Sequence, residues 1–178
     1  MGVPRWGRGP VTAHIPDPVI HSSAWVAPGA HVYGHVTIGA EVSVLFGSVI
    51  RAEYDLIVVG AGTNVQDNSV VHSDEDIPCT IGERVTVGHG VVIHGTRIGD
   101  RALIGIGARV LNRSTIGEGA WLAAGAVLTE GSSIPPWTLA IGIPARPIRD
   151  LTDEEATRAD EGVDRYIELA AAYREILG

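Results

Sequence analysis

Large aliphatic residues recur at every sixth position along most of the chain. The longest unbroken series is Ile98, Ile104, Val110, Ile116, Leu122, Leu128 and Ile134. Four places after each of the first six stands a small residue: Ala102, Ala108, Ser114, Ala120, Ala126 and Ser132. A period of six matches neither an α-helix nor a simple alternating strand. It predicts short strands separated by sharp corners, with three hexapeptides completing one triangular coil of a solenoid.

The same period is present earlier in the chain, but it is interrupted three times. The earlier aliphatic positions are Val26, Val32, Ile38, Val44, Ile50, Val59, Val65, Val71, Ile81, Val87 and Ile93. Three extra residues fall before Val59 and four before Ile81, and one residue is missing before Ile98. Interruptions in a solenoid are where loops and sites lie. A β-sandwich is the alternative, but its turns would recur every 8 to 12 residues.

We therefore expect an all-β fold, a left-handed parallel β-helix of hexapeptide repeats followed by a C-terminal α-helix. The repeat stops after Pro144, and Thr152 with Glu155 forms a capping box that predicts a helix running towards Leu177. The expected segments are an N-terminal extended arm (1–24), the β-helix with the metal site (25–148) and the C-terminal helix (149–178). This helix should pack on the prism or on a neighbouring chain.

Composition and charge exclude several classes of partner. The chain has 178 residues and a net charge of −8, and its 13 basic residues are scattered. No cationic stripe is present to attract nucleic acid or an anionic membrane. No apolar run reaches the roughly 18 residues that a membrane span needs, so we expect a cytoplasmic protein. The single cysteine, Cys79, is expected to be an inert loop residue.

Two histidines share a register position on neighbouring coils. His72 and His94 each follow a core aliphatic residue, and their separation of 22 residues equals one coil plus the four-residue insertion. Adjacent strands lie about 4.8 Å apart, so the two rings should stack at a distance that suits one tetrahedral metal ion. Arg51 occupies the same column one coil earlier.

A third histidine belongs to another side of the triangle. His89 follows Val87 on the preceding side, so it cannot meet His94 within one rigid prism. A neighbour related by threefold symmetry can supply it. Asp67 lies one coil before His89, with Gln66 beside it, so both should enter the neighbour's site together with His89. The sequence therefore predicts a metal site at the boundary between two subunits.

These residues resemble the gamma-class carbonic anhydrases. The resemblance runs from about Ser22 to the Gly142-Ile143-Pro144-Ala145 stretch. The segments that carry it are Arg51, Asn64-Val65-Gln66-Asp67-Asn68, Val71-His72, Ile81-Gly82, Val87-Gly88-His89 and Ile93-His94-Gly95. It implies a homotrimer that hydrates carbon dioxide reversibly to bicarbonate by metal-bound hydroxide.

The resemblance also implies a role for each site residue. His72, His89 and His94 would bind zinc, or alternatively iron or cobalt. Arg51 and Asp67 would bridge two subunits, and Gln66 would orient the metal-bound water or bicarbonate. Glu53 stands where the family commonly has an aspartate.

The chain departs from the family pattern in two further places. The loop Ser73 to Thr80 is short, so no proton shuttle is assigned, and Glu75 is the first guess. Leu139-Ala140-Ile141 replaces a segment that often holds a tyrosine. Two other functions therefore stay open. One is an acyltransferase or thioesterase that uses a lone histidine as base on a coenzyme A substrate. The other is a metal-binding trimer with little or no catalysis.

Overall fold

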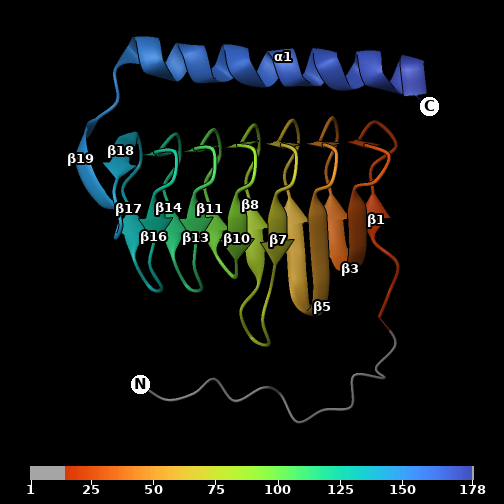
Figure 1. Ribbon diagram of the computed structural model, residues 1–178, viewed down its shortest axis with the longest axis horizontal. Helices are drawn as coiled ribbons and strands as arrows, with labels where there is room; N and C mark the ends of the chain where they lie inside the picture. The colour runs from red at the N-terminus through yellow and green to blue at the C-terminus, as the bar shows by residue number, and fades with distance from the viewer. Residues whose placement is uncertain (1–14, 178) are drawn as a thin grey trace.

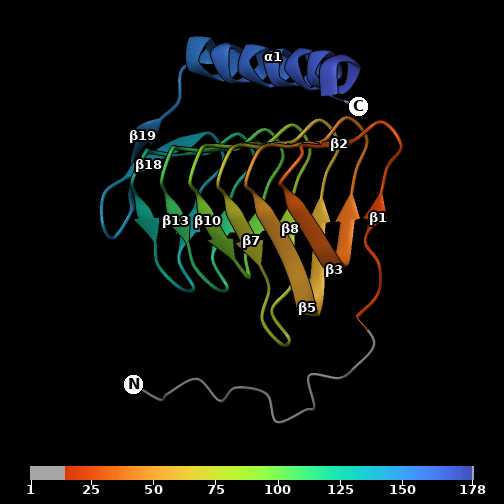
Figure 2. The ribbon, with the colours of Figure 1, turned by 45° about the vertical axis from the view of Figure 1, so that its right-hand side comes forward.

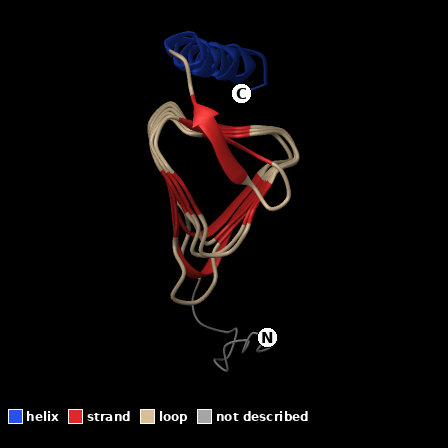
Figure 3. Cartoon of the chain, turned by 90° about the vertical axis from the view of Figure 1, so that its left-hand side faces the viewer, coloured by secondary structure: helices blue, strands red, loops and turns tan. Residues whose placement is uncertain are grey.

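The computed structural model describes residues 15–177, which wind into a prism with a triangular cross-section (Figure 3). One sheet contains β1 (Val19–Ile20), β3 (His31–Ile38), β5 (Val49–Val59), β7 (Val70–His72), β8 (Cys79–Ile81), β10 (Val92–His94), β11 (Arg97–Ile98), β13 (Arg109–Val110), β14 (Thr115–Ile116), β16 (Val127–Leu128) and β17 (Ser133–Ile134). The other contains β2 (Trp25–Val26), β4 (Ser43–Val44), β6 (Asn64–Val65), β9 (Thr86–Val87), β12 (Leu103–Ile104), β15 (Trp121–Leu122), β18 (Thr138–Ile141) and β19 (Arg146–Asp150).

The first of these sheets covers two sides of the prism because β5 turns a corner without a break. Its start, Val49–Arg51, pairs with β7, and its end, Ile57–Val59, pairs with β8. Between the named strands of residues 15–177, every pairing is parallel except that of β18 with β19. A β-sandwich would require antiparallel neighbours throughout. The predicted left-handed β-helix of hexapeptide repeats is therefore confirmed.

The six-residue positions point into the prism. All seven residues of the longest series are at most 2% exposed, and so is Ile93 on the preceding coil. Val26 and Val32 are only partly buried, and Val26 lies on β2, the terminal strand of its sheet. With no further coil to cover them, residues at an end of a solenoid stay partly open to solvent.

The four-residue insertion forms a loop that projects from the prism between β7 and β8 (Figure 2). An isolated bridge between Asp74 and Ile77 closes this loop. The prediction that Cys79 is a loop residue was wrong, because it lies in β8 and is fully buried. Burial raises the pKa of the Cys79 thiol to about 12, so its reactive thiolate does not form near neutral pH.

The C-terminal helix α1 (Asp153–Leu177) lies along the eight-stranded sheet, against β2, β4, β6 and β9 (Figure 1). The predicted capping box is present. The Glu155 amide donates to Thr152 Oγ1 at 3.2 Å, and the Thr152 amide donates to Glu155 Oε2 at 2.9 Å. Tyr173 of the helix stacks on Trp25 with ring centroids 5.2 Å apart.

Only part of the expected apolar helix face is covered. Val163 and Ala170 are buried, whereas Leu169, Ile176 and Leu177 are exposed. No helix within residues 15–177 is long and apolar enough to cross a membrane.

The ladder extends beyond both expected segment boundaries. β1 lies in the segment expected to be an arm, yet it pairs in parallel with β3. At the other end β19 continues to Asp150. Residues 1–14 of the expected arm and residue 178 lie outside the described residues.

Glycines that follow core residues let the backbone of one coil lie directly on that of the next, so a side chain at such a position should destabilise the fold. A Cβ added at Gly60 would lie 2.5 Å from the carbonyl carbon of Gly82. Gly60→Ala should destabilise the protein by about 2 kcal/mol in urea unfolding, because backbone atoms cannot move aside. Gly162→Ala is the matched control. Its Cβ meets nothing within 4 Å in a helix, so it should stabilise the protein by about 1 kcal/mol. Equal effects would contradict this interpretation.

Candidate metal centre

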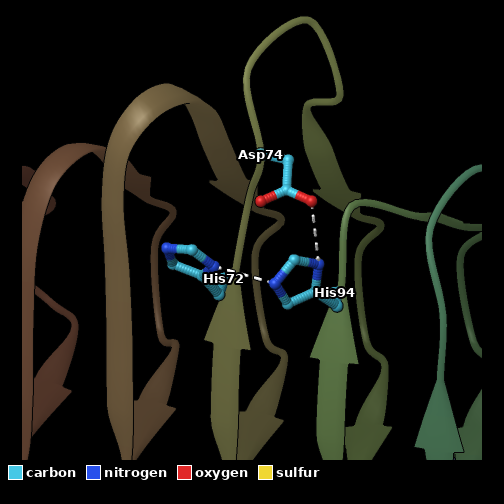
Figure 4. A group of neighbouring side chains, drawn as sticks. All are labelled: His72, Asp74 and His94. Carbon is cyan, nitrogen blue, oxygen red and sulfur yellow. Dashed lines mark hydrogen bonds and ion pairs between the residues drawn. The ribbon is translucent and has the colours of Figure 1, made fainter. Parts of the chain in front are cut away.

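The predicted histidine column is present on the side of the prism formed by β5, β7 and β10. His94 pairs in register with His72, and His72 pairs with Arg51 on the preceding coil. The His72 and His94 rings are partly buried and have centroids 4.8 Å apart. Figure 4 shows both side chains on the same side of the ladder, so the spacing arithmetic placed them correctly.

The two rings face each other through one nitrogen each. His72 Nδ1 lies 2.9 Å from His94 Nε2. The outer nitrogen of His72, Nε2, lies 3.1 Å from Glu53 Oε2. An ionised carboxylate only accepts hydrogen bonds, so His72 Nε2 carries the proton and Nδ1 keeps a free lone pair. Glu53 also forms an ion pair with Arg51, which holds the carboxylate in place.

The outer nitrogen of His94 meets a different group. His94 Nδ1 lies 2.7 Å from Asn112 Oδ1, and Asn112 Nδ2 donates to Asp74 Oδ2 at 2.8 Å. Because the Asp74 carboxylate accepts only, the amide nitrogen of Asn112 must face it and the amide oxygen must face His94. The neutral form of the His94 ring therefore carries its proton on Nδ1, which leaves the lone pair on Nε2.

Two unprotonated nitrogens thus point at each other from neighbouring coils. Such lone pairs repel unless a cation lies between them. Two ligands at about 2.0–2.1 Å from a tetrahedral zinc ion lie about 3.3 Å apart, so the rings need to separate by only a few tenths of an ångström. Burial, together with the nearby positive charge of Arg51, lowers the pKa of His72 to about 4. The ring is neutral near pH 7, which is the form that binds metals.

His89 lies on the turn after β9, away from this pair. Its Nδ1 lies 2.8 Å from Asp67 Oδ2, and its side chain is 45% exposed. Within residues 15–177, the group of side chains close enough to share an ion consists of His72, Asp74 and His94. The structure therefore agrees with the expectation that one chain does not assemble all three histidines.

Gln66 and Arg51 differ in how firmly they are held. Gln66 is buried, and its amide nitrogen donates to Asn64 Oδ1 at 3.0 Å. Asn64 in turn donates to Thr86 Oγ1 at 3.1 Å. The Arg51 side chain is 48% exposed beside the histidine column. The hydrogen bonds through Asn64 thus fix the amide of Gln66, while the Arg51 side chain is about half exposed to solvent.

Sequence reasoning missed Asp74 and Asn112. Asp74 is the loop carboxylate that approaches His94, with 3.8 Å from its Oδ2 to Nδ1. Glu75, the guess for a proton shuttle, is exposed on the same loop, and its role stays a prediction. Asn112 directly follows Leu111, the residue one coil beyond His94 in the register set by Ile93 and Val110. The repeat was enough to place Asn112 near His94. It could not show that the Asn112 amide contacts both His94 and Asp74.

Known proteins resemble the chain over most of its length. Residues 17–52 match the family model described as bacterial transferase hexapeptide (six repeats). A putative acetyltransferase from Bacillus cereus, known as a crystal structure, has a TM-score of 0.88 and 38% identity and covers 89% of this chain and 92% of that one. Mitochondrial gamma carbonic anhydrase 1 of Arabidopsis thaliana is 39% identical over 162 residues. That match covers 88% of this chain but 59% of the plant protein.

An archaeal relative is matched almost from end to end. The probable carbonic anhydrase of Methanocaldococcus jannaschii is 42% identical over 152 residues, which are 85% of this chain and 96% of that protein. Identity at this level over nearly the whole relative, together with the plant match, shows that the chain belongs to the gamma carbonic anhydrase family.

Proposed function

We propose that the chain is a metal-dependent carbonic anhydrase that hydrates carbon dioxide reversibly to bicarbonate as a homotrimer. The observation that carries this proposal is the pair of facing ring nitrogens, His72 Nδ1 and His94 Nε2, which lie 2.9 Å apart. The names of the relatives support the reaction. Zinc is the metal that we favour, with iron or cobalt as alternatives, because imidazole nitrogen is a ligand for all three.

In this proposal the metal ligands are His72 and His94 of one subunit and His89 of its neighbour. Asp67 accepts the Nδ1 proton of His89, which leaves Nε2 free to bind. Glu53 accepts the Nε2 proton of His72, which leaves Nδ1 free to bind. A hydrogen-bonded acceptor behind each ligand fixes its tautomer and raises its basicity. The exposed position of His89 suits a residue that serves another chain.

Four further residues complete the site. The exposed Arg51 would pair with Asp67 of the neighbouring subunit, because an ion pair is tolerated at an interface when both charges are matched. Gln66, held by Asn64, would direct its free amide oxygen at a hydroxyl of the substrate; this Oε1 accepts no hydrogen bond within residues 15–177. Glu53 keeps Arg51 and His72 in place. The bound metal would supply Lewis acidity, which turns water into a nucleophile near neutral pH.

We further propose a cytoplasmic location. A lone cysteine that is fully buried needs no oxidising compartment.

Replacing one ligand tests the metal assignment. His94→Ala should lower the zinc content from about one ion per chain to near zero, because two remaining ligands hold zinc poorly. Carbon dioxide hydration, followed by stopped flow with a pH indicator, should fall with it. His21→Ala is the matched control and should change neither quantity, since this exposed histidine follows β1, which pairs with Thr37 and Ile38 of β3. Full zinc content in the His94→Ala protein would overturn the assignment.

Mixing two inactive variants tests whether the site is shared between subunits. His89→Ala and His94→Ala each spoil every site in a homotrimer. When the two are unfolded together and refolded in equal amounts, about a quarter of the interfaces should combine an intact His72–His94 column with an intact His89. Activity should return to about a quarter of the wild-type value. No recovery, with trimers confirmed by light scattering, would contradict a shared site.

Acyl transfer is the competing function, since one similar crystal structure is that of a putative acetyltransferase. That reaction needs one histidine as base and no metal. Incubation with acetyl coenzyme A and amine acceptors, with and without a zinc chelator, separates the two. Acyl transfer that survives the chelator, without carbon dioxide hydration, would replace the proposal above.

A further inference from the structure

Asn112 and Asp74 lie on opposite sides of His94 along the prism. In the sheet, β10 lies between β7 and β13. Asp74 belongs to the loop that follows β7, and Asn112 lies just after β13. Their side chains meet through a 2.8 Å hydrogen bond, and the amide oxygen of Asn112 reaches His94 Nδ1 at 2.7 Å. Figure 4 shows Asp74 directed at the outer edge of the His94 ring.

The backbone leaves room for this arrangement at Gly95. A Cβ at that position would lie 2.5 Å from Asn112 Oδ1 and 2.6 Å from Ile77 Cγ2. Gly95 also has a φ of +48°, a conformation that favours glycine. The residue after His94 therefore has no side chain at the point where the Asn112 amide must lie, and the projecting loop packs into the same space.

Asp74 has two possible roles, and the geometry separates them. As a metal ligand it would have to approach the nitrogens that face each other, His72 Nδ1 and His94 Nε2. Its Oδ2 atom instead accepts from Asn112 and lies 3.8 Å from the protonated Nδ1 of His94. Ligand atoms of Asp74, His72 and His94 lie within 4.8 Å of one another, but the contacts that Asp74 makes are to Asn112 and to Nδ1, the outer nitrogen of His94. Asp74 therefore acts on the amide of Asn112.

We propose that Asn112, oriented by Asp74, is a positioning residue that holds His94 in the Nδ1-protonated tautomer with Nε2 turned towards the metal. The proposal rests on the proposed function for its effect on metal binding, but the tautomer itself is a property of the metal-free chain. An acceptor behind a metal-binding histidine is worth about 10-fold to 100-fold in metal affinity. Asn112 has this role for His94, as Glu53 and Asp67 have for the other two histidines.

The test compares four full-length variants by zinc affinity, measured in competition with a chromophoric chelator. Asn112→Ala should weaken zinc binding about 10-fold to 100-fold. Asp74→Asn should change it by less than about 3-fold, because an amide oxygen still accepts from Asn112. The Asp74→Asn/Asn112→Asp double variant reverses the pair. Its carboxylate at 112 accepts from both neighbours, so binding should stay at the wild-type level. Thr115→Ala, an exposed residue on β14, is the control and should have no effect.

A second readout needs no metal. In the metal-free protein with 15N-labelled histidine, NMR should show His94 protonated on Nδ1 in the wild type and in the reversed pair, and a mixture of tautomers in Asn112→Ala. Unchanged zinc affinity and tautomer in Asn112→Ala would overturn the inference. A large loss of zinc in Asp74→Asn would instead make Asp74 a ligand and would also overturn it.

The design separates failure of this inference from failure of the proposed function. If the wild-type protein binds no zinc, the proposed function fails, while the NMR spectra of the metal-free variants still decide whether Asn112 positions His94. If Asn112→Ala does not fold, as judged by circular dichroism, the reversed pair carries the test. Wild-type zinc affinity and tautomer there support the inference, and their loss in a folded protein contradicts it.

Discussion

The parallel ladder between successive coils is the constraint on which the rest of the structure depends. It holds neighbouring strands about 4.8 Å apart and aligns residues that share a place in the repeat. Inside the prism this alignment stacks aliphatic side chains into one core. Outside it, the same alignment places the His72 ring against the His94 ring, at a separation that two ligands of one ion can adopt with little movement. The core and the candidate site are therefore two consequences of one spacing.

What distinguishes this column from ordinary surface histidines is the set of acceptors behind the rings. A side-chain oxygen of Glu53, Asp67 or Asn112 faces one ring nitrogen of each histidine and can accept a hydrogen bond from it. An acceptor at one ring nitrogen forces the lone pair onto the other. A histidine pair without such partners could share a proton between its rings, but here the outer nitrogen of each ring faces an oxygen acceptor, which favours the proton on that side. A cation is the natural partner for that arrangement.

Each of the three interruptions in the repeat has a different structural consequence near the candidate site. The three-residue insertion lets β5 continue round a corner, which brings Glu53 close to His72. The four-residue insertion forms the loop that carries Asp74 to Asn112. The missing residue tightens the chain after His94, where Gly95 leaves space for the Asn112 amide. The regular coils supply rigidity, and the departures from the period supply the polar groups around the site.

The sequence by itself determined the solenoid, the stacking of Arg51, His72 and His94, the separation of His89 from that column, and the capping box of the C-terminal helix. Each of these follows from counting residues, because a period of six converts sequence distance directly into position on the prism. Only the tertiary structure decided that Cys79 is buried in a strand, that Glu53 reaches His72, and that Asp74 and Asn112 meet across His94. Those contacts depend on how far side chains extend from corners and inserted loops, where the repeat no longer sets the position of the backbone. Counting residues therefore identified the histidine column, and the tertiary structure determined which polar groups contact it.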